Sequence, residues 1–122
     1  MKLTNLVLLN SEKPLSKLKT QNLPIKVAYK LNKNIHLISE QLKFIEEQRL
    51  TLIKKYGSST KDGGYYIDKN DVNSYNKFAN DFMEILQIEE SIDILPFNLD
   101  ELSDVCLTSD DLDMISFLVS EN

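Results

Sequence analysis

A regular alternation of three- and four-residue spacings between apolar side chains runs through the first half of the chain. It forms an a/d heptad seam over four repeats, in which Arg49 is the only charged residue. Pro24 is tolerated in the first turn of a helix, and Gly57 is typical of a helix end. The pattern predicts one long helix over residues 24–56. Its seam consists of Ala28, Leu31, Ile35, Ile38, Leu42, Ile45, Arg49, Leu52 and Tyr56.

The length of this helix constrains the rest of the fold. Its 33 residues would span about 50 Å, whereas a compact chain of 122 residues has a radius of gyration of only ~14 Å. A second helix is predicted over residues 71–90, capped by Asn70 or Asp71, and its ~30 Å would cover little more than half of the first. We expect the N-terminal segment, the C-terminal segment or another chain to cover the remainder.

The shorter elements have weaker patterns. The N-terminal segment, residues 1–22, contains an apolar run that fits either a strand or a helix. Residues 91–99 favour a β-strand that Pro96 confines to a sheet edge or an extended arm. We expect this strand to pair with Tyr65–Ile67 or with Leu6–Leu9.

The C-terminal residues predict a short helix over 109–119. Thr108 and Asp111 form an acidic variant of the capping box at its start. Together, the elements predict a single domain over residues 1–122, mainly α with a minor β element (α+β). Its parts are a long helical hairpin, a short β-strand pair and a short capped C-terminal helix.

Charge is distributed very unevenly along the chain. The net charge is −5, but residues 1–61 carry twelve basic and four acidic side chains, whereas residues 62–122 carry two and fifteen. We expect no sequence-specific binding of nucleic acid, because base edges are read mainly by Arg, Asn and Gln, and this acidic chain has a single Arg. No apolar run approaches the ~20 residues of a membrane span, so we expect no membrane association.

Side chains that could perform chemistry are few. His36 takes a b-type position that normally faces solvent, and Cys106 is the only cysteine. Adjacent acids such as Glu46 and Glu47 point about 100° apart on a helix, and the acids after Thr108 are explained by the helix dipole. No calcium loop or phosphate loop is complete. We therefore expect a protein that is not an enzyme, with no catalytic residues, no bound metal and no cofactor.

Arg49 is the most informative single residue. It stands where the seam calls for an apolar side chain, and it is the only guanidinium in the chain. One interpretation is an ion pair within the chain, with Glu84 or Glu89 as the expected partners. The other is that Arg49 fixes the register of a helix contact between subunits. The predicted interaction residues are Arg49, Ile35, Ile38, Leu42, Ile45, Leu52 and Tyr56.

Four segments in order resemble a family of small proteins, of no agreed activity, encoded by tailed phages and prophages. They are LPIKVAYKLNKN (Leu23–Asn34), FIEEQRLTLIKKYG (Phe44–Gly57), SIDILPFNLDEL (Ser91–Leu102) and LTSDDLDMISFLV (Leu107–Val119). The family patterns are similar to LPxKxAY, EExRxxLxxKYG, DIxPxxLxxL and LTxxDLxxxxFL. The chain departs from the usual pattern at Ser91 and at Ser109. The resemblance implies a phage source, and it assigns no site residues.

Two functions remain open on these grounds. The first is a non-enzymatic structural or assembly protein of the virion, which contacts itself or other phage proteins through its helices. The second is a small phage protein that binds a host protein and inhibits or redirects it. The expected location is accordingly the virion or the host cytoplasm.

Overall fold

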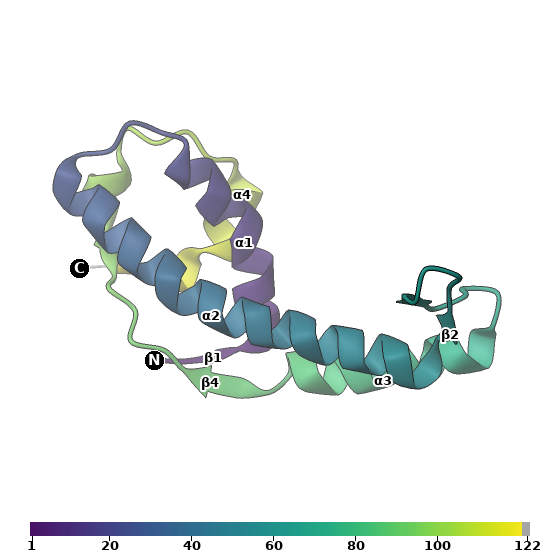
Figure 1. The fold of residues 1–122 in the computed structure, drawn as a ribbon. Coiled ribbons are helices and arrows are strands. Elements are labelled where there is room, and N and C mark those ends of the chain that lie inside the picture. Colours follow the sequence, from purple (N-terminus) through teal and green to yellow (C-terminus); the bar gives the residue numbers. More distant parts are fainter. Residues whose placement is uncertain (121–122) are drawn as a thin grey trace.

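The fold is organised around one long helix, and two other helices pack against different parts of it. A computed structural model describes residues 1–120; Glu121 and Asn122, the last residues of the expected domain 1–122, lie outside the described part. The four α-helices are α1 (Asn5–Lys19), α2 (Ile25–Tyr56), α3 (Val72–Leu86) and α4 (Ser109–Met114). The architecture is mainly α with a minor β element, and it contains the expected long helical hairpin (Figure 1).

Helix α2 takes part in two different packing arrangements. Its first half packs against α1, and its second half pairs with α3. The first half, with α1, α4 and the C-terminal segment, forms a rounded part that we call the head; the second half and α3 project from it as a two-helix arm (Figure 1). The second helix thus covers one part of the long helix, as expected, and of the alternatives for the remainder the N-terminal segment is the one that packs along it as α1.

The observed bounds correct several details of the expected elements. The N-terminal segment is a three-residue strand, β1 (Lys2–Thr4), followed by α1, whose Pro14 lies inside the helix. The second helix ends at Leu86 rather than at residue 90. At the C-terminus, α4 is followed by the 3₁₀ turn η2 (Ser116–Leu118) and by β6 (Val119–Ser120).

Within residues 1–120, six short strands form three two-stranded pairs. β4 (Glu89–Ser91) pairs antiparallel with β1, and β2 (Ser58–Ser59) pairs antiparallel with β3 (Tyr65–Tyr66). β5 (Phe97–Asn98), which precedes the 3₁₀ turn η1 (Leu99–Leu102), pairs parallel with β6. The expected pairing of residues 91–99 with Tyr65–Ile67 or Leu6–Leu9 is therefore wrong. Tyr65 and Tyr66 are instead taken by the neighbouring β2 in a local hairpin.

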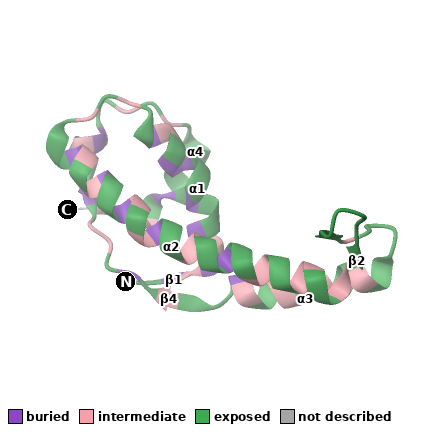
Figure 2. Cartoon of the chain, in the orientation of Figure 1, coloured by how far each residue is buried: buried purple, intermediate pink, exposed green. Residues whose placement is uncertain are grey.

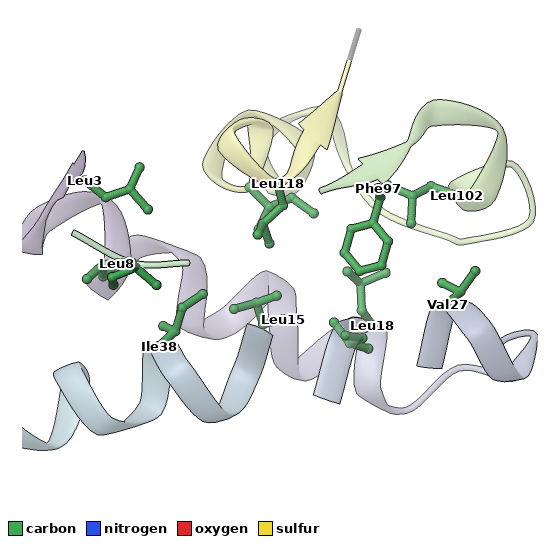
Figure 3. Packing of buried hydrophobic residues seen from close by; sticks show 12 residues of the cluster. Leu3, Leu8, Leu15, Leu18, Val27, Ile38, Phe97, Leu102 and Leu118 are labelled. Carbon is green, nitrogen blue, oxygen red and sulfur yellow. The ribbon is translucent and has the colours of Figure 1, made fainter. Parts of the chain in front are cut away.

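The hydrophobic core lies in the head. The C-terminal segment covers one side of the α1–α2 pair, and apolar side chains from all three converge between them (Figure 3). Phe97, Ile115 and Leu118 are completely buried in this core. Its twelve buried members are Leu3, Leu8, Leu15, Leu18, Val27, Leu31, Ile38, Ile92, Phe97, Leu102, Ile115 and Leu118.

Two amide side chains, one buried and one half-buried, hold the extended C-terminal segment in place. Asn34 of α2 is completely buried; its Nδ2 donates to the carbonyl oxygen of Leu95 (2.8 Å), and its Oδ1 accepts from the Leu95 N–H (2.8 Å). Gln21 forms the same two hydrogen bonds with the backbone of Cys106: its Nε2 donates to the carbonyl oxygen (3.0 Å), and its Oε1 accepts from the N–H (2.9 Å). Each amide thus takes the place of a neighbouring strand.

We predict that Asn34→Leu lowers the free energy of unfolding by about 1–3 kcal/mol, because both backbone groups of the half-buried Leu95 lose their partners. Denaturant unfolding followed by circular dichroism measures the change. Asn32→Leu is the control, since Asn32 is exposed on the same helix and its replacement should cost less than about 0.5 kcal/mol. Equal stability of the two variants would contradict the role of the Asn34 amide.

Candidate functional site

The projecting arm is built with little burial of its own. Figure 2 shows that buried residues gather in the head and at the base of the arm, while the outer arm is exposed or half-buried. Between Gln41 and Glu90 only Ile45 and Leu86 are buried. The arm therefore has almost no core of its own, and many of its large apolar side chains face solvent.

A few specific contacts hold the arm to the head and to itself. Asn5, at the start of α1, is buried and donates from Nδ2 to the carbonyl oxygen of Ile85 (2.9 Å). Gln41 of α2 donates to Asn5 Oδ1 (3.0 Å), so this one amide joins α1, α2 and α3 at the base. Further out, the Tyr56 hydroxyl donates to Asp81 Oδ2 (2.6 Å). These contacts fix the direction of the arm.

The tip of the arm is a tight hairpin. Helix α2 ends at Tyr56 and is capped by Gly57, where any Cβ would collide with the backbone oxygens of Tyr66 and Ile53. The chain then forms β2, turns through Gly63, whose φ of 84° is a conformation that glycine tolerates, and returns as β3.

The predicted interaction residues separate into three groups. Ile38 and Ile45 are 1% and 2% exposed, so they pack inside the chain and are not available to a partner. Ile35 and Leu42 are half-buried and, with Ile38, line a groove of about 230 Å³ between α1 and α2. The remaining three, Arg49, Leu52 and Tyr56, are half-buried along the arm.

The ion pair of Arg49 is within the chain, but its partner differs from the expected ones. The guanidinium binds Glu46 of the same helix with both Nε (2.8 Å) and Nη2 (2.6 Å), in place of Glu84 or Glu89. Hydrogen bonding to Glu46 raises the pKa of Arg49, and the reciprocal bond lowers the pKa of Glu46. Three residues along one helix suffice to bring these groups together, so the seam position does not require a partner on α3.

Several exposed apolar residues on the arm were not among the predicted interaction residues. The pattern that could have found them is the width of the α3 stripe, which covers more of the helix than one neighbouring helix can bury. Two of them, Phe44 and Leu50, come from α2; the others come from the tip, from α3 and from the residue just before β4. The exposed residues are Phe44, Leu50, Tyr65, Tyr66, Val72, Tyr75, Met83 and Ile88.

Part of the charge split is neutralised inside the head. Lys17 Nζ of α1 lies 2.6 Å from Asp111 Oδ2 of α4, and Lys30 Nζ of α2 lies 3.0 Å from Glu101 Oε1 of η1. The Lys17 ammonium, with smaller contributions from Thr108, lowers the pKa of Asp111. The Asn98 N–H, followed by Lys30, lowers the pKa of Glu101. The two pairs join the basic half of the chain to the acidic half.

The described residues contain no group of three or more His, Cys, Asp or Glu side chains that could hold a metal ion. His36 is exposed on α2, as expected for its heptad position, and Cys106 is an exposed free thiol. None of the described helices is long and apolar enough to cross a membrane.

The stability of the head should depend on the ionisation of Asp111. The folded-state pKa of this carboxyl lies below its unfolded value of about 3.9, so its contribution is complete above that value and is lost as the pH falls through the folded pKa. We predict that Asp111→Asn is less stable than the unmodified protein at pH 7 and that the difference shrinks below about pH 3.5. Thermal unfolding across this range measures it; a constant difference would contradict the assignment. Asp110→Asn, at an exposed neighbour that forms no salt bridge with another residue of the described range 1–120, serves as the control.

The arm should open more readily than the head. Helices α1 and α3 both contain 15 residues, but six residues of α1 are buried, whereas only one residue of α3 is buried. We predict that hydrogen–deuterium exchange is at least about tenfold faster for the amides of α3 than for those of α1, because local opening of α3 exposes less apolar surface. Mass spectrometry of peptides from the two helices makes the comparison within one sample. Equal protection would mean that something further covers the arm.

Comparison with family models, with curated proteins and with solved structures found no match to this chain. The arm is therefore assigned as the candidate site on its geometry and exposure alone.

Proposed function

We propose that this protein is a non-enzymatic, phage-encoded structural or assembly protein of the virion, and that it makes its contacts through the two-helix arm. The observation that carries the proposal is the projection of an amphipathic helix pair whose outward apolar side chains no other described element covers (Figure 2). Large apolar side chains exposed together on one element are typical of a protein-binding surface. The head, with its well-buried core, supplies a stable base for that surface.

The resemblance to small phage proteins supports the phage source in this proposal. Its four segments form the start of α2, the outer half of α2, the stretch from β4 to η1, and the stretch from α4 to β6. Three of these segments belong to the head, where Phe97 is buried in the core and the Thr108–Asp111 capping box begins α4. The second segment contributes the outer half of α2, including Glu46, Arg49 and Leu50.

The proposal predicts that the arm touches another particle protein or a second copy of this chain. A photo-crosslinking amino acid placed at Leu50, which is 53% exposed on the arm, should yield crosslinks in purified phage particles. The same amino acid at Leu99, in the head, should yield fewer. Mass spectrometry of the particles and of the crosslinked bands identifies the neighbours.

Two results would overturn the proposal. One is the absence of the protein from purified particles. The other is a crosslink from Leu50 to a single host protein outside particles, which would favour instead a protein that binds a host factor and inhibits or redirects it.

A further inference from the structure

The arm has one open face that consists of apolar side chains from both helices. On α3, Val72, Tyr75, Ala79 and Met83 follow one another at spacings of three and four residues, so they share one side of the helix. Val72 is 63% exposed and Met83 is 50% exposed. The other apolar side of α3, formed by Phe78, Phe82 and Ile85, is half-buried, and α2 is the helix packed along it.

Helix α2 contributes Leu50 and Ile53 to the same face. In two antiparallel right-handed helices, residues rotated in the same sense from the two contact lines emerge on the same side of the pair. Ile45 marks the side of α2 that faces α3, and Phe78 marks the side of α3 that faces α2. At 100° per residue, Leu50 and Ile53 are rotated away from Ile45 in the same sense as Val72, Tyr75, Ala79 and Met83 are rotated away from Phe78. Phe44 is rotated in the opposite sense and lies on the other side. We call the six residues Leu50, Ile53, Val72, Tyr75, Ala79 and Met83 the open face.

Charge changes sign along the arm. Its base, residues 40–47 and 77–90, carries seven acidic and two basic side chains, a net −5. Its outer part, residues 48–76, carries five basic and three acidic side chains, a net +2. A partner lying along the whole arm is therefore complementary if it is basic where the arm is acidic and acidic where the arm is basic. A second arm that runs in the opposite direction has this distribution.

We infer that two copies of this chain pair through their open faces, with the arms antiparallel about a two-fold axis, to form a four-helix bundle. The tip of each arm then lies against the acidic base of the other, and the same six residues are used on both copies, as two-fold symmetry requires. Parallel pairing would place the two acidic bases together. This inference rests on the proposed function, because it names the partner of the same surface.

The size of the face sets the strength of the pairing. Helix α3 contains 15 residues and is about 22 Å long, so the six residues that each arm contributes are fewer than the ~20–30 residues a side of a standard stable interface. The dimer should accordingly dissociate at about micromolar concentration, and its affinity should fall as salt screens the attraction between tip and base.

Sedimentation velocity of the full chain, at a series of concentrations and at 50 and 500 mM NaCl, tests the pairing. The expected result is an equilibrium between a 14.1-kDa monomer and a species of twice that mass, at least about threefold weaker at the higher salt. Val72→Lys and Met83→Lys should each weaken the dimer at least about tenfold, since a charge then enters the apolar face. Both positions are exposed, so neither change should unfold the monomer.

Two matched variants control for the added lysine. Phe44→Lys changes a residue that is 49% exposed on the other side of the arm, and Leu99→Lys changes one that is 62% exposed in the head. Both should leave the dimer unchanged. If they weaken it as much as the open-face variants do, the open face is not the interface and the inference is overturned.

Cysteine crosslinking with a short bismaleimide tests the direction of the arms, on a Cys106→Ser background. A mixture of Val72→Cys and Met83→Cys chains should crosslink efficiently, because the tip of one arm meets the base of the other. Val72→Cys chains alone should crosslink poorly, and efficient crosslinking there would overturn the antiparallel arrangement. A chain that stays monomeric at every concentration would overturn the inference as a whole, whereas the proposed function fails only by the particle experiments described for it.

Discussion

The burial of an extended chain segment against helices is the constraint on which the head depends. Helices satisfy their own backbone groups and offer none to a neighbour, so an extended segment laid on them leaves its N–H and C=O groups without partners. Asn34 and Gln21 solve this problem with amide side chains, each of which both donates to and accepts from one residue of the segment. Without Asn34, the half-buried Leu95 would need another strand or water as its partner, whereas at the exposed Cys106 water can replace Gln21.

The same device explains why the arm points in a fixed direction. Asn5 accepts from Gln41 and donates to the end of α3, so one buried amide meets all three long helices where the head ends and the arm begins. Next to it, β1 pairs with β4 and ties the N-terminus to the residues that follow α3. The arm is therefore anchored at its base by directional bonds and not by apolar packing alone.

What could be predicted from the sequence was carried by local signals. The heptad seam, Pro24 and Gly57 predicted α2 to within one residue, and the Thr108–Asp111 capping box predicted the start of α4. The pairing of β1 with β4 could not be predicted in this way, because each strand has only three residues and the two strands lie far apart in the sequence. The partner of Arg49 is in contrast a local one. Glu46 lies three residues earlier on the same helix, whereas the expected partners Glu84 and Glu89 lie far along the chain.

The proposed interaction surface could be predicted only in part from the sequence, because a seam shows which residues are apolar and not which element covers them. Ile38 and Ile45 belong to the seam but are buried within the chain, whereas Val72 and Met83 lie off it and are exposed. The charge split resolves in the same way. In the head, Lys17 and Lys30 meet acids of the C-terminal segment, so opposite charges there stabilise one chain. On the arm, the acidic base and the basic outer part are separated along its length. Arg49 and Glu46 already pair across that boundary within one chain, and the inferred second arm, running in the opposite direction, brings the remaining opposite charges together.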